Sequence, residues 1–320
     1  TTADVPHGAR FFPSVLVNPD GTPEQRKNVI ALYERDGGLL WKHYEQYKNI
    51  NESRRGRELV LSSIATIGNY DYSLLYVFRQ DGGIEVQAQL TGIMLPKGVE
   101  DTTVTTHDQY GGHLVTRRVV APNHQHFFSF RIDPDIDGTA NTISEIDAWA
   151  PPAGTKENPN GNAIVMDEVK LRNEREAQRN MSLEKSRVWK IASASAKNTL
   201  GAATSFLLIP VENAVPYLSN DNIIRKRAGF LNNHLWATRY KPHELYAAGD
   251  YPSQSHGGDG LPAFVADNES IENEDLVVWY TMGITHLPRN EEYPIMNVHK
   301  GGFKLYPAGF FDYNPAMDVR

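Results

Sequence analysis

The chain has 320 residues, of which 40% are hydrophobic and 22% charged, so it can bury a sizeable core and is not a disordered chain. Its net charge of −7 includes no excess of basic residues, which disfavours a nucleic-acid-binding protein. It contains no cysteine, which excludes disulfides, thiolate nucleophiles and cysteine-ligated metal sites. Any metal ion would therefore be held by histidines and carboxylates.

Apolar and polar residues alternate with a period of two through much of the chain, which predicts β-strands. In chain order, the predicted strands are residues 58–67, 69–78, 84–90, 113–120, 124–132, 143–149, 188–191, 204–209 and 275–282. The turn residues Asp81-Gly82-Gly83 separate the second strand from the third and predict a hairpin. Residues 169–179 are dense in charge and are the best candidate for a helix, placed on the surface.

The sequence shows no internal repeat, no low-complexity linker and no apolar run of the roughly 20 residues that a membrane span needs. We therefore predict one all-β domain over residues 1–320, a large antiparallel β-sandwich with no membrane partner. No targeting signal is recognisable in these residues, so secretion and peroxisomal import are equally compatible with the sequence.

Two histidines, His124 and His126, are separated by one residue in a predicted strand. Residues i and i+2 point to the same face of a strand, so both imidazoles can bind one ion such as zinc or copper. Taken alone this pair is weak evidence, because two ordinary strand histidines give the same pattern. His286 follows an apolar strand pattern and is a candidate third ligand, although a hydrogen-bonded core histidine explains its spacing equally well.

Alternating aspartates follow the strand that carries the two histidines. Asp133 and Asp135 flank Pro134, and carboxylates with an intervening carbonyl suit a hard cation such as Ca²⁺. A polar turn after a strand is the alternative. Elsewhere, Tyr70 and Tyr72 share one strand face, where a core position is the default expectation for an aromatic residue.

Several segments together resemble the catalytic domain of the copper-containing, topaquinone-dependent amine oxidases. Asn69-Tyr70-Asp71-Tyr72 resembles the cofactor motif of that family, and residues 122–138 resemble its metal strand with the turn that follows. Residues 273–286 resemble the segment with the last metal ligand, and residues 309–316 resemble the end of the domain. The resemblance extends from about residue 4 to residue 319, and the motifs occur in the family's order.

The resemblance implies a role for each matching residue. Tyr70 would be oxidised to topaquinone, Asn69 would help to orient that quinone, and Met296 would lie near the copper. The implied Cu(II) ligands are His124, His126 and His286. A structural calcium or manganese ion would be held by Asp133, Asp135, Asp275 and the carbonyl groups of Pro134 and Leu276, and a second calcium by Glu174, Asp267 and Glu269.

The implied activity is oxidative deamination of a primary amine by O₂, giving an aldehyde, ammonia and hydrogen peroxide, in a homodimer with a large β-supersandwich. In the family the catalytic Asp lies upstream of the segment that matches this chain. We therefore find no general base here, and we expect very poor turnover from the 320-residue piece alone. Asp71 adjoins Tyr70 but faces the other side of the strand, which makes it a poor substitute.

Two alternatives belong to other functional classes. One is a catalytically silent, metal-stabilised β-sandwich with a binding or structural role, and the other is a three-histidine zinc hydrolase in which Tyr70 has no part. The sequence does not predict which primary amine is the substrate. Val5 and Ala31 occupy positions where many members of the family have a disulfide pair, so both halves of that pair are missing together.

Overall fold

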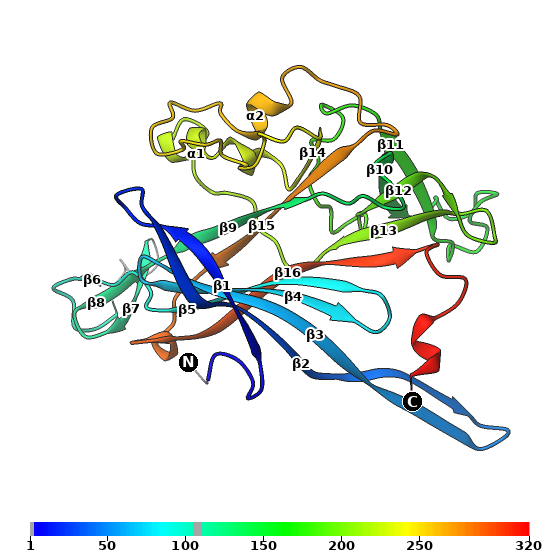
Figure 1. Ribbon diagram of the computed structural model, residues 1–320, viewed down its shortest axis with the longest axis horizontal. Coiled ribbons are helices and arrows are strands. Elements are labelled where there is room, and N and C mark those ends of the chain that lie inside the picture. The colour runs from blue at the N-terminus through cyan, green and yellow to red at the C-terminus, as the bar shows by residue number, and fades with distance from the viewer. Residues whose placement is uncertain (1–2, 105–110, 320) are drawn as a thin grey trace. The chain divides into compact units, whose positions relative to one another are not determined.

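Nearly all regular structure in the computed structural model is β-strand, which confirms the predicted fold class (Figure 1). The structure describes residues 3–104 and 111–319. The chain divides into two compact units. Unit 1 comprises residues 1–124, 285–304 and 313–320, and unit 2 comprises residues 125–284 and 305–312.

Unit 1 is built on an antiparallel meander in which each strand pairs with the next along the chain. Its strands are β1 (Arg10–Val17), β2 (Pro23–Glu45), β3 (Ile50–Ile67), β4 (Tyr70–Arg79) and β5 (Ile84–Gly92), and β16 (Met296–Ala308) lies next to β5. A small sheet has the order β6 (Lys97–Gly98), β8 (Val119–Pro122) and β7 (Gly112–Thr116). Short 3-10 turns are η3 (Asn290–Glu292) and η4 (Pro315–Asp318).

The predicted hairpin around the Asp-Gly-Gly turn is confirmed. β4 and β5 pair from Tyr70 opposite Gly92 to Phe78 opposite Ile84, and Gly82 has the positive φ of 82° that such a turn requires. The meander keeps apolar residues on one face, where Val60, Leu75 and Val77 form a buried cluster. This sheet is the support for the residue that begins β4, Tyr70.

β2 and β3 continue past their neighbours as a two-stranded arm, visible as the long ribbon in Figure 1. Among the described strands, residues 39–45 and 50–55 pair only with each other. The C-terminal turn η4 lies on this arm, where Trp41 Nε1 donates a hydrogen bond to the Ala316 carbonyl (2.9 Å). Arg54 Nε likewise donates to the Val319 carbonyl (3.0 Å).

Unit 2 contains two further sets of strands and the short helices. One sheet has the order β13 (Ala203–Pro210), β12 (Val188–Lys197), β10 (Asn141–Trp149) and β11 (Val165–Leu171), and the other has the order β14 (Leu235–Arg239), β15 (Leu276–His286) and β9 (His124–Ile132). The helices are α1 (Ile223–Arg227), η2 (Gly229–Asn232) and α2 (Leu261–Phe264). β15 is buried almost throughout, and Trp279 packs with Trp236 and Leu261 in its core. Strands β9, β15 and β16 each have residues in both units.

Two predicted elements are wrong. Residues 169–179 are no helix: β11 continues to Leu171, and local side-chain contacts organise the turn that follows, such as Arg172 N–H donating to Glu176 Oε2 (2.8 Å). Residues 113–120 are not one strand but parts of the hairpin β7–β8, which turns at Arg118 with a φ of 62°. Strands β1, β2, β11, β14 and β16 were not predicted as strands, and β3 and β12 were predicted only in part. In β1, β2, β11 and β16, charged, glycine or proline residues interrupt the alternation.

Among the described residues, no helix is long and apolar enough to cross a membrane.

Candidate active site

Tyr70 is the first residue of β4, directly after a two-residue turn of Gly68 and Asn69. Gly68 supplies the positive φ (63°) of this turn. Gly92 lies opposite Tyr70, and a Cβ there would approach the Asn69 carbonyl oxygen to 2.6 Å, so only glycine fits without a shift. The Asn69 carbonyl accepts a hydrogen bond from Ile93 N–H (2.8 Å). The turn, together with the pairing of β4 to β3 and to β5, therefore fixes the backbone of Tyr70.

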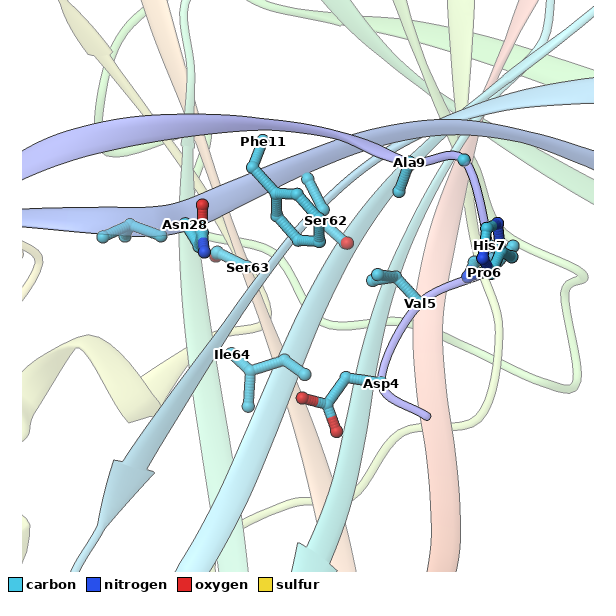
Figure 2. A pocket seen from close by; sticks show the side chains of 13 residues that line it. Asp4, Val5, Pro6, His7, Ala9, Phe11, Asn28, Ser62, Ser63 and Ile64 are labelled. Atoms are coloured by element: carbon cyan, nitrogen blue, oxygen red, sulfur yellow. The ribbon is translucent and has the colours of Figure 1, made fainter. Parts of the chain in front are cut away.

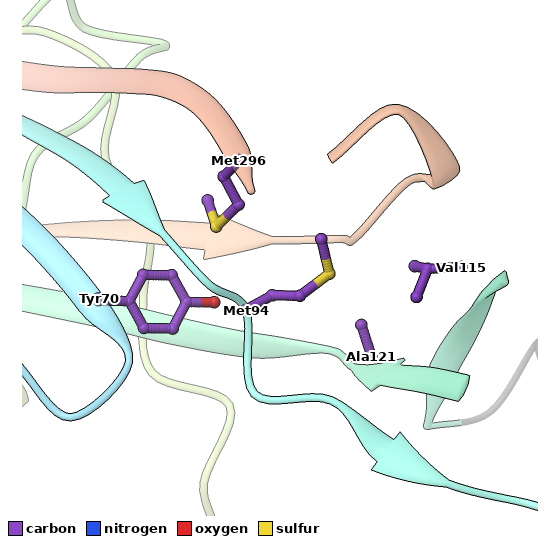
Figure 3. Close-up of a cluster of buried hydrophobic side chains, with 5 residues drawn as sticks. All are labelled: Tyr70, Met94, Val115, Ala121 and Met296. Atoms are coloured by element: carbon purple, nitrogen blue, oxygen red, sulfur yellow. The ribbon is translucent and has the colours of Figure 1, made fainter. Parts of the chain in front are cut away.

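The Tyr70 ring is buried, with 3% of its surface exposed. It stacks on Tyr72 at a centroid separation of 5.9 Å, as expected for residues i and i+2 of one strand. Met94 and Met296 belong to the same hydrophobic cluster, in which Figure 3 shows Met296 beside the Tyr70 ring. Met296 therefore lies close to Tyr70, while its predicted place near the copper stays a prediction. Asn69 has an exposed side chain, and its orienting role stays a prediction.

The polar end of Tyr70 meets two histidines from distant parts of the chain. Its phenol oxygen lies 2.6 Å from His124 Nε2 and 3.4 Å from His286 Nδ1. The same two nitrogens lie 3.3 Å from each other. Asp71 takes another direction, as predicted, and accepts a hydrogen bond from Thr66 Oγ1 (2.5 Å).

The other nitrogen of each ring indicates which tautomer is present. His124 Nδ1 faces the Pro122 carbonyl oxygen (2.8 Å), and His286 Nε2 faces a Glu292 carboxylate oxygen (3.0 Å). Carbonyl and carboxylate oxygens only accept hydrogen bonds, so these two nitrogens carry the protons. The nitrogens that face each other and the Tyr70 hydroxyl then both offer lone pairs. Such a donor pair fits a bound cation.

His126 lies two residues beyond His124 on β9. Because both residues lie in one strand, alternation predicts that the two side chains point to the same face. His126 belongs to the part of β9 that lies in unit 2, so its relation to Tyr70 and His286 remains a prediction.

Burial sets the protonation of these groups. It lowers the pKa of His286, although the carboxylate of Glu292 acts in the opposite direction, and a neutral imidazole is the form that binds a metal ion. Burial also raises the pKa of the Tyr70 phenol, and the negative charge of Glu292 raises it further. Without a cation nearby, the phenol is therefore protonated at neutral pH.

Glu292 and His299 were not identified from the sequence. The Glu292 carboxylate accepts a hydrogen bond from His286 Nε2. His299 Nε2 forms a short hydrogen bond to the same carboxylate, so His299 contacts the site through Glu292. Six or seven residues separate these partners along the chain, a spacing that matches neither helix nor strand periodicity. The one available signal was the position of Glu292 shortly after a candidate metal ligand.

The first predicted acidic site does come together within unit 2. Asp133, Asp135 and Asp275 each offer a carboxylate oxygen, and these oxygens lie within 4.8 Å of one another. Burial raises the pKa of Asp275, and the negative charges of the other two aspartates add to this effect. Pro134 lies between the first two aspartates, and Leu276 follows the third at the start of β15.

The second predicted acidic site also assembles, but a lysine already lies in it. Oxygens of Glu174, Asp267 and Glu269 lie within 4.8 Å of one another. Lys241 Nζ lies 2.9 Å from Asp267 and 2.7 Å from Glu269. Burial raises the pKa of Glu174 to about 7, even though backbone N–H groups of Arg239 and Glu269 donate to it. Calcium would have to compete with the Lys241 ammonium group here.

A surface hollow of about 550 Å³ lies beside the N-terminal residues of unit 1. Figure 2 shows Val5, Phe11 and Ile64 around it, together with the carboxylate of Asp4. Val5 and Ala31 both line this hollow, and their correspondence to a disulfide pair stays a prediction.

Comparison with known proteins shows which family this chain belongs to. The sequence profile described as "Copper amine oxidase, enzyme domain" matches residues 1–320. The chain is 41% identical over 309 residues to a histamine oxidase of Arthrobacter globiformis, covering 97% of this chain and 44% of that protein. It is 35% identical over 315 residues to a copper-containing, peroxisomal diamine oxidase of Nicotiana tabacum, covering 97% and 39%.

The fold agrees with the sequence comparison. A crystal structure of a copper-containing benzylamine oxidase from Hansenula polymorpha matches with a TM-score of 0.90 and 33% identity, covering 98% of this chain and 48% of that one. The chain thus spans less than half the length of these relatives. On the match along its whole length, this chain belongs to the copper amine oxidase family, and its residues correspond to the enzyme domain.

Proposed function

We propose that this chain is the catalytic domain of a copper-dependent primary-amine oxidase in which Tyr70 is the precursor of topaquinone. One observation carries the proposal: the buried phenol oxygen of Tyr70 lies 2.6 Å from His124 Nε2 and 3.4 Å from His286 Nδ1. A metal ion held by these nitrogens would contact the phenol directly. A phenol placed only for packing has no need of two inward-facing imidazole lone pairs.

The proposed copper ligands are His124, His126 and His286. The first and third present unprotonated nitrogens to each other, and the second shares the strand face of the first. Three neutral imidazoles suit Cu(II) and leave positions open for water or dioxygen. Because a divalent cation favours the charged form of a neighbouring acid, copper binding would lower the raised pKa of the Tyr70 phenol.

The oxidations balance with dioxygen as the only oxidant. Conversion of the tyrosine ring to the quinone inserts two oxygen atoms and removes two hydrogens, so it consumes two O₂ and releases one H₂O₂. In each turnover RCH₂NH₂, O₂ and H₂O give RCHO, NH₃ and H₂O₂, with the amine oxidised and dioxygen reduced by two electrons. The quinone, when formed, supplies the electrophile that natural side chains lack.

The residues around Tyr70 keep the reacting ring dry and in place. Met94 and Met296 pack in its cluster, and Tyr72 lies stacked against it. The rigid turn before Tyr70 and the glycine opposite it hold the ring at the histidines. A ring that is fixed and shielded from water is suited to a quinone that would otherwise react with other nucleophiles.

The proposal leaves the general base outside this chain. The family resemblance assigns that role to an Asp upstream of the matching segment, so amine turnover depends on residues other than these 320. The relatives are described as oxidases of histamine, diamines and benzylamine, which supports the primary-amine class rather than one particular amine. Quinone formation, in contrast, depends on residues of this chain and can be tested with it.

The test is to load the metal-free protein with Cu(II) in air and then add an arylhydrazine. A coloured adduct on the peptide containing Tyr70, located by mass spectrometry, is the expected result. Stoichiometric copper without any quinone or adduct would contradict the proposal and favour a silent relative. Tight zinc binding that is unaffected by Tyr70 replacement would favour a hydrolase.

We also propose a structural calcium or manganese ion at Asp133, Asp135 and Asp275. Three carboxylates within 4.8 Å repel one another in the absence of a cation, and this repulsion adds to burial in raising the pKa of Asp275. Carbonyl oxygens of Pro134 and Leu276 would complete an all-oxygen ligand set. The group of Glu174, Asp267 and Glu269 is the weaker candidate, because Lys241 neutralises two of its members.

A homodimer is the proposed assembly, as the family resemblance implies. The two-stranded arm of β2 and β3 supports it, since Leu39, Tyr44 and Tyr47 are large, exposed side chains on or next to the arm. Sedimentation analysis of the protein, compared with a variant carrying serine at these three positions, tests it. A dimer that survives the change would show that the arm is not the contact.

A further inference from the structure

Glu292 is a fully buried carboxylate with four hydrogen-bond donors around it. It ends the turn η3, between the strand that carries His286 and the strand that carries His299, and none of its surface is exposed. Oε2 accepts from Arg289 N–H (2.9 Å) and from His286 Nε2 (3.0 Å). Oε1 accepts from the Arg289 guanidinium group (3.2 Å) and forms a short hydrogen bond with His299 Nε2.

This donor set keeps the carboxylate ionised and correctly oriented. All four hydrogen bonds come from nitrogen donors, and the ionised carboxylate is the form that can accept all of them. Arg289 and His299 occupy one oxygen, so the other oxygen is directed at the His286 ring. A buried carboxylate with its oxygens committed in this way cannot rotate without losing several charge-assisted bonds.

The hydrogen bond between Glu292 and His286 determines which nitrogen of His286 faces the metal site. A carboxylate next to Nε2 keeps the proton on that nitrogen and leaves the lone pair on Nδ1. Nδ1 is the nitrogen that faces His124 Nε2 (3.3 Å) and the Tyr70 hydroxyl (3.4 Å). With the proton on Nδ1 instead, the ring would place a hydrogen where a cation should bind.

We propose that Glu292 is a positioning residue for His286: it selects the Nε2–H tautomer, fixes the ring plane and strengthens Nδ1 as a metal ligand, while His299 holds the carboxylate in that orientation. The inference rests on the proposed copper site. Partners of this kind, one shell away from the metal, orient histidine ligands and raise their basicity. Arg289 supports the same carboxylate from the turn, but His299 comes from a separate strand, β16, and so links the two strands through Glu292.

Glu292→Gln is the decisive variant, because the amide has the same size but only one oxygen acceptor. Its NH₂ group would face either His286 Nε2 or the donors on the other side. Copper affinity, measured by competition with a chelator of known affinity, is expected to fall about 10- to 100-fold. The Cu(II) electron paramagnetic resonance spectrum should also show a changed parallel hyperfine splitting, which a purely structural residue would not alter.

A second readout needs no copper. Long-range ¹H–¹⁵N correlation of the histidine rings reports which nitrogen of His286 carries the proton in the metal-free protein. The expected result is the Nε2–H tautomer in the wild type and a mixture of tautomers in Glu292→Gln. A wild-type His286 protonated on Nδ1 would overturn the proposal even if the variant failed to fold.

Two further variants separate positioning from stability. Glu58 is a buried carboxylate of the same unit, 7% exposed, that binds Arg35 (2.8 Å) and Arg79 (3.0 Å) away from the histidines. Glu58→Gln should lower thermal stability but leave copper affinity and the His286 tautomer unchanged. His299→Gln should weaken copper binding less than Glu292→Gln does, because it loosens the carboxylate without removing it.

The outcomes distinguish this inference from the proposed function. Wild-type copper affinity, spectrum and tautomer in Glu292→Gln would overturn the positioning role and leave the copper proposal intact. Equal losses of copper affinity in Glu292→Gln and Glu58→Gln would reduce the effect to general destabilisation and also overturn it. A wild-type protein that binds no copper would refute the proposed function, while the tautomer measurement would still decide whether Glu292 controls His286.

Discussion

The hydroxyl of Tyr70 lies 2.6 Å from Nε2 of His124, although 54 residues separate them in the chain. β4 begins at the tyrosine and β9 begins at the histidine, so both side chains are placed by the first residue of a strand. Strand ends of this kind combine a rigid backbone with access to a site, which loops alone do not provide.

Replacing Tyr70 by Phe should abolish formation of the quinone while leaving copper binding within a few-fold of the wild type. The variant removes one oxygen that contacts His124 and His286 but keeps the ring that packs with Met94 and Met296. Arylhydrazine staining after copper loading in air measures the quinone, and metal analysis measures copper. Tyr72→Phe, which retains the stacked ring next to the site, is the control and should still stain. Full staining of Tyr70→Phe would mean that another residue is oxidised.

Copper should stabilise the folded protein through its histidines. A ligand that binds only the native state at 100 times its dissociation constant adds about 2.7 kcal/mol to the free energy of unfolding. Differential scanning calorimetry with and without Cu(II) should therefore show a rise in melting temperature that a chelator reverses. His124→Ala should eliminate the rise, whereas His43→Ala, an exposed histidine on the arm, should preserve it. Equal responses of both variants would show that copper stabilises through a different site.

Much of the fold could be predicted because strand alternation is a local signal. The strand with both candidate ligands, residues 124–132, has the predicted limits, and the hairpin around Gly82 has its predicted turn. The failures have local explanations too. Around residues 172–176, asparagine and glutamate side chains bind nearby backbone groups, and the isolated pairing of Asn173 with Ser270 replaces the helix that charge density suggested.

Only part of the site could be predicted from the spacing of residues in the sequence. Spacing places His124 and His126 on one face, but nothing in it brings His286 to Tyr70, which lies 216 residues away. Physical reasoning alone left Tyr70 as a core aromatic, and only the resemblance of its motif gave it a chemical role. Glu292 escaped detection because its importance comes from burial and from four donors, which tertiary structure creates and sequence spacing does not reveal.

The stability of unit 2 should fall at acidic pH through Asp147. Arg187 binds both oxygens of this aspartate (2.7 and 2.8 Å), and its hydrogen bonds lower the pKa of Asp147 from 3.8 to about 2. Because the folded-state pKa is the lower one, the stabilisation is complete above pH 4 and is lost as the pH falls towards 2. With the side chain 17% exposed, its size is about 1–2 kcal/mol after allowance for solvent screening.

Urea unfolding of Asp147→Asn between pH 2 and pH 6 measures this contribution. The variant should be less stable than the wild type at pH 6, and the difference should shrink towards pH 2. Asp221→Asn, at an exposed position of the same unit, is the control and should follow the wild-type curve. A difference between Asp147→Asn and the wild type that is constant with pH would refute the ionic explanation.

Calcium should bind to the three aspartates of unit 2, and its affinity should fall as the pH is lowered. Burial and the charges of Asp133 and Asp135 raise the pKa of Asp275, so protons compete with the cation at a higher pH than for an ordinary aspartate. Asp135→Asn removes one ligand charge and should weaken calcium binding by roughly tenfold or more, or about 1.4 kcal/mol. It should also relieve repulsion, so the calcium-free variant should be at least as stable as the calcium-free wild type.

Asp137→Asn is the matched control, because Asp137 lies in the same turn but accepts a hydrogen bond from Thr204 (2.6 Å). Isothermal titration with Ca²⁺ and with Mn²⁺, together with calorimetry of the ion-free proteins, decides the matter: equal affinities for the wild type and Asp135→Asn would exclude these aspartates as ligands.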